Sequence, residues 1–465
     1  MANAEKISII GAGSIQFSMD TIRDIALTPD LQGSEVVFMD VDKERLSMVT
    51  TLAKRFNNEV GADIHIKSTD NQKEAITDAR FIVNTALAGG HQSMENERNL
   101  QETRGYYHGI SVHAPFRQLE LMHQVANDVE KYGKSNAFVL QLANPIPEGC
   151  TVMSRETNAK VIGLCNGFLE YKKILEVMKT PQSKTDYEAI GINHCIWMTK
   201  LSVDGKNMYP DIDNWINEKS EEYWKSWNPE FDEMQMSPAS IDLYKLYGLM
   251  PIGDTCRASW PEAWWYHLNQ ETKKRWWGTT GGHDGELGWQ LHLNWLKERQ
   301  KQIITAVENP NIPLTNIFPA IHSCEQLVPI IDAIANNKPN IFQVNVPNNG
   351  AIPGLPDNFV IEIPAVINKN GVQVLKTETL PNSVMFGVIY PRWLFAERII
   401  ATYKTGDKKF MLQAYLSDNR TRTREQAEDT IDAVVSMPGN EVFAQKVNDF
   451  INDHEIKVRN HLNIV

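Results

Sequence analysis

Three side chains that can bind metals or move protons lie just after structured segments of this sequence. Cys165 ends the apolar run VIGLC, His194 ends the run IGINH, and Asp254 lies in a Gly-Asp-Thr loop beyond a helical pattern. If the two runs are strands of one parallel sheet, their carboxyl ends meet at one edge and can face one cleft. A thiolate and an imidazole could there bind a divalent transition metal, and Asp254 could act as a general base.

Each of these residues also has an ordinary structural interpretation. The spacing between Cys165 and His194 fits no zinc-knuckle pattern, and single cysteines and histidines are usually core or incidental residues. An aspartate in such a loop often hydrogen-bonds its own turn. Residue types and spacing alone therefore leave both the metal site and the base open.

A glycine turn near the start of the chain predicts a dinucleotide site. Gly11 and Gly13 lie where a predicted strand turns into a helix, so backbone amides can face a pyrophosphate. Asp40 ends the second predicted strand, where a carboxylate binds the adenosine ribose and favours NAD over NADP. Gln16 replaces the third glycine of the usual fingerprint, so a structural turn and a solvated aspartate are the competing interpretations.

The pattern of predicted elements changes near residue 200. Strands at 6–10, 36–39, 81–85, 137–142 and 160–164 alternate with helices, which predicts an α/β fold with a parallel sheet. Longer helical patterns follow, and Ser237-Pro238 predicts the start of one helix. Seven of the twelve tryptophans lie between Trp260 and Trp295. We expect a Rossmann-like NAD-binding domain at 1–197 and a different, second domain at 198–465. Core packing explains most of the tryptophans, although such rings also suit sugars.

Composition excludes several classes of protein. The net charge is −12 without a long basic run, which argues against a nucleic-acid partner. The chain has no signal-like start and no uninterrupted apolar stretch of membrane-spanning length. Five cysteines without close pairing argue against a disulfide framework. We therefore expect a cytoplasmic protein with reduced thiols and no membrane partner.

Several motifs together resemble glycoside hydrolase family 4 over nearly the whole chain, and they occur in the family's order. They are IIGAGSIQF, FMDVD, VNTALAGGH, ANPIPEG, CNG, GINHCIW, SPASIDLYKLYG, MPIGDTCRASW, ETKKRWWG, VNVPNNG and YPR. The similarity is greatest to the family's α-glucosidases and α-glucuronidases. It implies a fold like that of lactate and malate dehydrogenases, in which residues 198–465 form a mixed α+β domain for substrate binding and oligomerisation. It also implies a divalent metal that is usually Mn²⁺, NAD held without net consumption, and homodimers or homotetramers.

The resemblance also implies roles for individual residues. Cys165 and His194 would hold the metal, and Asp254 would be the base. Residues near the cofactor would be Gly11, Gly13, Ser14, Gln16, Asp40 and Asn84, and residues near the sugar would be Asn144, Asn166, Asn193 and Arg257. The family's reaction oxidises the sugar at C3, removes the C2 proton, eliminates the aglycone, adds water and reduces C3 again.

Two positions depart from the glucosidase pattern. Asn166 stands where the α-glucosidases and α-glucuronidases usually have histidine. The family's 6-phospho-β-glucosidases also have asparagine at this position. Unlike a histidine, an amide cannot act as an acid or base near neutral pH. Cys256 stands where some members have a tyrosine base. The glycone and the anomeric preference therefore stay open, and both anomers are possible substrates.

Our hypothesis is a glycosidase that acts on non-phosphorylated glucosides or glucuronides. The alternatives are a 6-phospho-glucosidase, an NAD-dependent dehydrogenase of a hydroxy acid or sugar, and a non-catalytic NAD-binding protein. Steady accumulation of NADH would favour the dehydrogenase. Tight NAD binding without dependence on a metal would favour the non-catalytic protein.

The first prediction concerns the thiol of Cys165. As a soft metal ligand it is open to oxidation, so activity should require a reducing agent. Cys165→Ser should lose manganese-stimulated activity in a glycoside assay. Full stimulation of the variant by Mn²⁺ would exclude this cysteine as an essential ligand.

Overall fold

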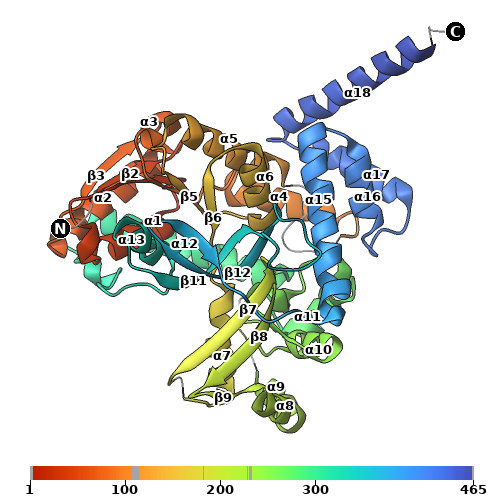
Figure 1. Cartoon of the computed structure of the whole chain (residues 1–465), viewed down its shortest axis with the longest axis horizontal. Helices are drawn as coiled ribbons and strands as arrows, with labels where there is room; N and C mark the ends of the chain where they lie inside the picture. Colours follow the sequence, from red (N-terminus) through yellow and green to blue (C-terminus); the bar gives the residue numbers. More distant parts are fainter. Residues whose placement is uncertain (1–3, 107–114, 182, 228, 230–232, 463–465) are drawn as a thin grey trace.

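The computed structural model describes residues 4–106, 115–181, 183–227, 229 and 233–462, with side chains as far as residue 452. Within these residues thirteen strands form one sheet, and its main path runs β10-β8-β7-β12-β11-β6-β5-β4-β1-β2-β3. β13 pairs with β12, and β9 pairs with β8. Helices pack around this sheet, and helices near the carboxyl terminus gather to one side (Figure 1).

The first part of the chain forms a parallel sheet in the order β3-β2-β1-β4-β5-β6, the order of a Rossmann fold. The strands are β1 (Lys6–Ile10), β2 (Glu35–Met39), β3 (His65–Thr69), β4 (Phe81–Asn84), β5 (Phe138–Gln141) and β6 (Lys160–Gly163). The helices are α1 (Ile15–Ala26), α2 (Lys43–Glu59), α3 (Gln72–Ile76), α4 (Gly90–Glu102), α5 (Phe116–Tyr132), α6 (Ile146–Glu156) and α7 (Tyr171–Val177). The buried runs in β1, β4 and β5 are mostly apolar, as expected for a parallel sheet covered on both faces.

The rest of the sheet is antiparallel. It contains β7 (Thr185–Ile192), β8 (Cys195–Val203), β9 (Lys206–Asn207), β10 (Met250–Ile252), β11 (Asn340–Pro347), β12 (Val360–Asn368) and β13 (Gly371–Val374). Asn345 of β11 pairs with Gly163 of β6, and Glu362 of β12 pairs with Gly191 of β7. Two strands from late in the chain therefore join β6 to β7. β7 and β8 extend beyond the sheet as an arm that ends near α8 and α9 (Figure 1).

The remaining helices follow β9 in the chain. They are α8 (Tyr209–Glu218), α9 (Ser220–Ser226), α10 (Pro238–Tyr247), α11 (Gln270–Trp277), α12 (Glu286–Glu308), α13 (Leu327–Ala335), α14 (Asn382–Val384), α15 (Tyr390–Thr405), α16 (Lys408–Leu416), α17 (Arg424–Val435) and α18 (Glu441–Leu462). α18 projects away from the body of the molecule (Figure 1). No helix among the described residues is long and apolar enough to cross a bilayer.

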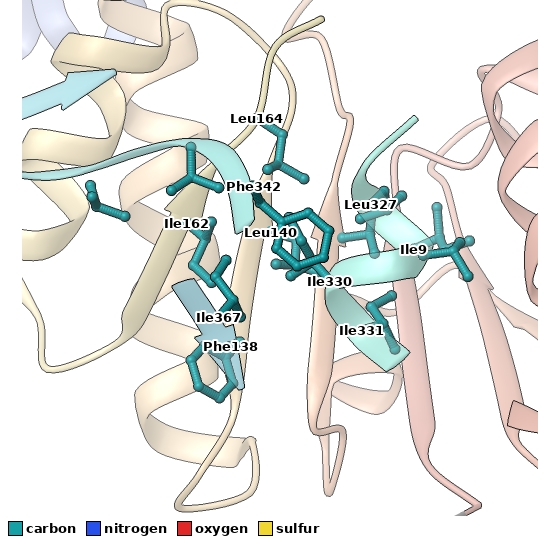
Figure 2. Packing of buried hydrophobic residues seen from close by; sticks show 14 of the residues in the cluster. Ile9, Phe138, Leu140, Ile162, Leu164, Leu327, Ile330, Ile331, Phe342 and Ile367 are labelled. Carbon is teal, nitrogen blue, oxygen red and sulfur yellow. The ribbon is translucent and has the colours of Figure 1, made fainter. Parts of the chain in front are cut away.

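The largest hydrophobic cluster joins the two parts of the chain. Leu327, Ile330 and Ile331 of α13 pack near Ile9 of β1, while Phe342 of β11 lies beside the strand residues Leu140 and Ile162 (Figure 2). All of these side chains are buried. Burying one such side chain contributes about 1.5–3 kcal/mol, so α13 and β11 fix the late segments onto the nucleotide-binding sheet.

The predicted α/β class, with a Rossmann-like parallel sheet followed by mixed α+β structure, is confirmed. The five predicted early strands are present, with ends that differ by one residue. The proposed boundary after residue 197 falls inside β8, and the sheet continues through both parts, so the division into domains 1–197 and 198–465 stays a prediction. Trp260, Trp277 and Trp289 are buried, whereas Trp295 is half exposed.

α10 begins and ends as the sequence predicts. The Oγ atom of Ser237 accepts a hydrogen bond from the backbone N–H of Ser240, Pro238 is the first helical residue, and Gly248 ends the helix with a φ of 75°. β10 and the loop of Asp254 follow at once. This cap therefore sets the point from which the chain enters the candidate site.

Ser237→Ala should lower the free energy of unfolding by about 1 kcal/mol, because the cap is lost. Urea denaturation measures the change. Thr423→Ala removes the equivalent cap of α17 and should destabilise by a similar amount, which makes it a matched control. An unchanged urea midpoint for Ser237→Ala would contradict this role of the cap.

Candidate active site

Cys165, His194 and Asp254 come together after β6, β7 and β10. The expectation that Cys165 and His194 follow strands of one parallel sheet is wrong, because β7 is joined to β6 through the antiparallel strands β11 and β12. One ligand atom from each lies within 4.8 Å of the other two. Nε2 of His194 is 3.0 Å from Oδ2 of Asp254. Sulfur, nitrogen and oxygen donors at this separation suit a divalent transition metal. Asp254, which the sequence suggested as a base, is thus also within reach of the ion that the other two would hold.

Backbone geometry holds two of these side chains in position. His194 lies in the two-residue connection between β7 and β8 and has a φ of +62°, a conformation that costs a non-glycine residue roughly 1–2 kcal/mol. Gly253 has a φ of +61°, and a Cβ there would lie 2.4 Å from the carbonyl oxygen of Gly167. The loops of Cys165 and Asp254 can therefore touch only because residue 253 is glycine.

The charges around Asp254 keep it ionised. Burial acts to raise the pKa of this carboxyl, but His194 and Arg257 outweigh it, so the pKa is lowered. Arg257 in turn donates to Asp284 from Nε at 3.0 Å and from Nη2 at 2.5 Å, and its Nη1 lies 3.4 Å from Oδ1 of Asp254. This bidentate pairing fixes the guanidinium plane beside the donor cluster.

A buried polar layer lies behind the cluster. Asn193 donates from Nδ2 to Oε2 of Glu362 at 2.8 Å, and Gln343 also approaches Glu362. Burial raises the pKa of Glu362 to about 7, while the hydrogen bond from Asn193 opposes the shift. Burial likewise raises the pKa of the Cys165 thiol, and the negative charge of Glu362 adds to the effect. A bound cation would supply the charge that favours a thiolate here.

The main pocket opens beside His194. Its lining includes Asn144, Asn193, His194, Arg257, Trp260 and Arg392. Arg392 donates to Oε1 of Glu148 at 2.6 Å, and Arg117 of the same pocket pairs with Glu97. Each of these arginines therefore already has an acidic partner. The pocket offers closely spaced donors and acceptors, which is the pattern that a ring with several hydroxyl groups needs.

At the glycine turn the backbone N–H groups of Gly11 and Ala12 donate to the carbonyl oxygen of Met39, so the expected contact of this turn with a pyrophosphate stays a prediction. Gly11 has a φ of +85°, and a Cβ there would lie 2.4 Å from Cα of Ala86. The backbone N–H of Gly13 donates to Oδ2 of Asp40 at 2.6 Å, and Asp42 N–H donates to Oδ1 at 2.9 Å. Asp40 thus lies at the end of β2 with its carboxylate fixed toward the turn, where a ribose hydroxyl could reach it.

The remaining predicted cofactor residues lie at different depths. Ser14 lines a second pocket. Asn84 is fully buried and donates to Oε1 of Gln141 at 2.8 Å, so its side chain joins β4 to β5. Gln16 donates to Asp20 and accepts from Arg299 of α12. Its long side chain thus reaches along α1 toward α12.

Asn144 and Asn166 are near the second pocket, which lies beside Cys165. Asn144 lines both pockets. Asn166 donates from Nδ2 to Oε1 of Glu325. With Asn193 and Arg257, all four predicted sugar residues therefore lie around the two adjoining pockets.

Sequence reasoning missed Glu362, Asp284, Glu148 and Glu325, and it assigned no role to Arg392 although the YPR motif contains it. Glu362 had a signal, since an acid inside the apolar run VIEIPAV is costly unless it is paired. Glu148 lies in the motif ANPIPEG, but nothing in that motif indicated its pairing with Arg392. Asp284 and Glu325 had no such signal. Their contacts become visible only when the chain is folded.

The structure is that of a Rossmann-type α/β protein with a glycine turn after its first strand and a candidate metal centre. Residues 6–180 match the family described as family 4 glycosyl hydrolase, and residues 189–421 match the C-terminal domain of family 4 glycosyl hydrolases. The chain belongs to this family of glycoside hydrolases.

Similar proteins cover most of the chain at low identity. An α-galactosidase of Rhizobium meliloti is 23% identical over 391 residues, which are 81% of this chain and 76% of that protein. An α-galacturonidase of Thermoanaerobacter italicus is 24% identical over 438 residues, 89% of this chain and 91% of that protein. The structure of a 6-phospho-α-glucosidase from gut microorganisms, in complex with NAD and Mn²⁺, has a TM-score of 0.75 and 17% identity, and the match covers 93% of this chain and 97% of that one.

Gly13→Ala should weaken NAD binding about 10- to 100-fold, because a Cβ would lie 2.7 Å from Oδ2 of Asp40 and displace the carboxylate. Isothermal titration calorimetry measures the affinity. Binding of Mn²⁺ should change little, since neither Gly13 nor Asp40 is one of the three donor residues.

Gly253→Ala should show the reverse. Its Cβ meets the backbone of Gly167, so the loops of Cys165 and Asp254 must separate and Mn²⁺ binding should fall while NAD binding is retained. Equal losses of both ligands in both variants would contradict the separate roles of the two glycines.

Proposed function

We propose that this protein is an NAD- and Mn²⁺-dependent exo-glycosidase that acts on non-phosphorylated hexosides or hexuronides. The observation that carries the proposal is the cluster of Cys165, His194 and Asp254, whose residues line two adjoining pockets or lie beside them. Family membership supports the glycosidase activity, and the similar structure that contains NAD and Mn²⁺ supports the dependence on both cofactors.

Cys165 and His194 are the proposed metal ligands. When bound, NAD accepts and returns a hydride at C3 of the sugar, and the metal ion stabilises negative charge on the neighbouring oxygens. Asn193 and Glu362 hold the turn of His194, so they orient one ligand. The fixed pairing of Arg257 with Asp284 keeps a cation beside the place where charge develops.

Asp254 is the proposed base for the proton on C2. Its lowered pKa keeps it ionised, and Oδ1 faces Arg257 while Oδ2 faces His194. Loss of the C2 proton next to an oxidised C3 allows the aglycone to leave by elimination, and water then adds to the unsaturated sugar. The same aspartate could instead complete the ligand set, and the experiments below separate the two roles.

The proposed preference for a glycone without phosphate follows from charge. Arg117, Arg257 and Arg392 of the pocket each pair with an acid. Among the described residues of this pocket, these pairs leave little uncompensated positive charge for a phosphate dianion. Paired groups still exchange hydrogen bonds with neutral hydroxyls or with a single carboxylate.

We also propose a homodimer or homotetramer located in the cytoplasm. Leu287, Leu291 and Trp295 form an exposed apolar row at helical spacing on α12, which a second copy could cover. The five cysteines are free thiols in the structure, and a reducing compartment preserves such thiols.

A panel of aryl glycosides tests the substrate class. With NAD, Mn²⁺ and reductant, gluco-, galacto-, glucurono- or galacturono-substrates should release aglycone in one or both anomers, whereas 6-phospho-glycosides should react at least about tenfold more slowly. No release from any non-phosphorylated substrate would refute the proposal. Steady accumulation of NADH would instead indicate a dehydrogenase.

Deuterium at C2 of the sugar tests the chemistry of Asp254. The label should slow turnover or exchange with solvent, and Asp254→Asn should abolish the exchange while it keeps Mn²⁺ binding. Full retention of the label during hydrolysis would argue for direct displacement. Loss of Mn²⁺ binding in the variant would identify Asp254 as a ligand.

A further inference from the structure

The second pocket has a lining that fits a flat heteroaromatic ring. Phe17, Leu142 and Leu164 supply apolar surface, and Cys165 of the candidate metal centre lies at its side. Ser14, Thr85 and Asn144 bring polar side chains into the same lining, and so does the hydrogen-bonded pair of Asn166 and Glu325. A ring with apolar faces and a polar substituent at its rim matches this mixed lining.

The direction of the fold indicates which end of the dinucleotide would enter this pocket. The glycine turn is the predicted contact of the pyrophosphate, and Asp40 marks the adenosine side at the end of β2. The other half must therefore extend across the ends of β4, β5 and β6, and the residues after these strands line the second pocket. Asn144 lines both pockets, so a ring here would adjoin a sugar in the main pocket.

Glu325 is held firmly although it comes from a loop. The backbone N–H of Ser323 donates to Oδ1 of Asp24 on α1 at 2.9 Å. Gln326 exchanges two hydrogen bonds of 2.9 Å with the backbone of Gln343 in β11. The segment around Glu325 is thus tied both to the helix that begins at the glycine turn and to the sheet.

The carboxylate itself has one donor among the described side chains. Nδ2 of Asn166 donates to Oε1 of Glu325. Burial raises the pKa of Glu325, and the hydrogen bond from Asn166 opposes this shift. The neighbouring Asp20 and Asp24 repel the carboxylate, so a further donor from a ligand would be favourable at Oε2.

We propose that Glu325 binds the carboxamide of the nicotinamide ring by accepting a hydrogen bond from its NH₂ group, and that Asn166 positions Glu325 for this contact. The proposal rests on the NAD dependence proposed above. It gives the asparagine after the metal cysteine a function in cofactor orientation that does not require it to carry a proton. A fixed carboxamide would also fix which face of the ring is turned toward the sugar.

Nicotinic acid adenine dinucleotide is the discriminating probe, because a carboxylate replaces the carboxamide. It lacks the NH₂ donor and adds a charge that Glu325 repels. Isothermal titration calorimetry of the full-length protein with Mn²⁺ should give NAD binding about 10- to 100-fold tighter than binding of this analogue. Glu325→Gln should reduce that ratio at least about tenfold, because the glutamine amide can donate to the carboxylate.

Two controls separate this effect from others. ADP-ribose lacks the nicotinamide and should bind wild type and Glu325→Gln equally, which also reports that the variant is folded. Asp20→Asn removes a nearby charge whose carboxylate engages Gln16 and Arg23, and it should keep the wild-type ratio. If Glu325→Gln does not fold, Asn166→Leu serves in its place. It removes the donor that positions the Glu325 carboxylate, so it should also lower the preference for NAD over nicotinic acid adenine dinucleotide.

The outcomes distinguish the two proposals. Wild type that binds neither NAD nor ADP-ribose would refute the proposed function. Wild type that binds NAD, together with an unchanged ratio in Glu325→Gln, would overturn the role of Glu325 alone. A fall of the ratio in Asp20→Asn equal to that in Glu325→Gln would also overturn it, because charge in general rather than one contact would then decide the affinity.

Discussion

The register between the late antiparallel strands and the parallel sheet determines where the candidate site forms. β11 and β12 lie between β6 and β7, so the strands before Cys165 and His194 are three spacings apart, about 14 Å. The loops after these strands must cross that gap for their side chains to meet. Asn345 pairs with Gly163, and Glu362 pairs with Gly191. These two pairings set the position along the strands at which the side chains of Cys165 and His194 meet.

The same register carries buried charge to the site. Glu362 reaches the turn of His194 from β12, and Arg257 is bound by Asp284 from the start of the α12 segment. Buried pairs of this kind add little net stability, because desolvation offsets their attraction. Their effect here is on position, because they fix dipoles and charges before a ligand binds. Groups fixed in this way stabilise charge that develops during a reaction without having to reorganise.

The sequence predicted the parts of the site that follow from local rules. The glycine turn follows β1, Asp40 follows β2 and Cys165 follows β6, as expected, whereas His194 follows an antiparallel strand and meets Cys165 from across β11 and β12. The contact between Asn166 and Glu325 spans 159 residues, and that between Asn193 and Glu362 spans 169. No local pattern encodes such contacts, because they depend on the insertion of β11 and β12 into the sheet. Likewise, a change of composition near residue 200 could not reveal that β8 continues the sheet across the expected boundary.

If Cys165 and His194 hold one ion together, Co²⁺ should bind there to a thiolate. Co²⁺ bound to a thiolate gives a sulfur-to-metal charge-transfer band in the near ultraviolet. We expect this band in the wild-type protein with one equivalent of Co²⁺, and its loss in Cys165→Ser. A band of full strength in Cys165→Ser, or tight Co²⁺ binding by the wild type without the band, would contradict it.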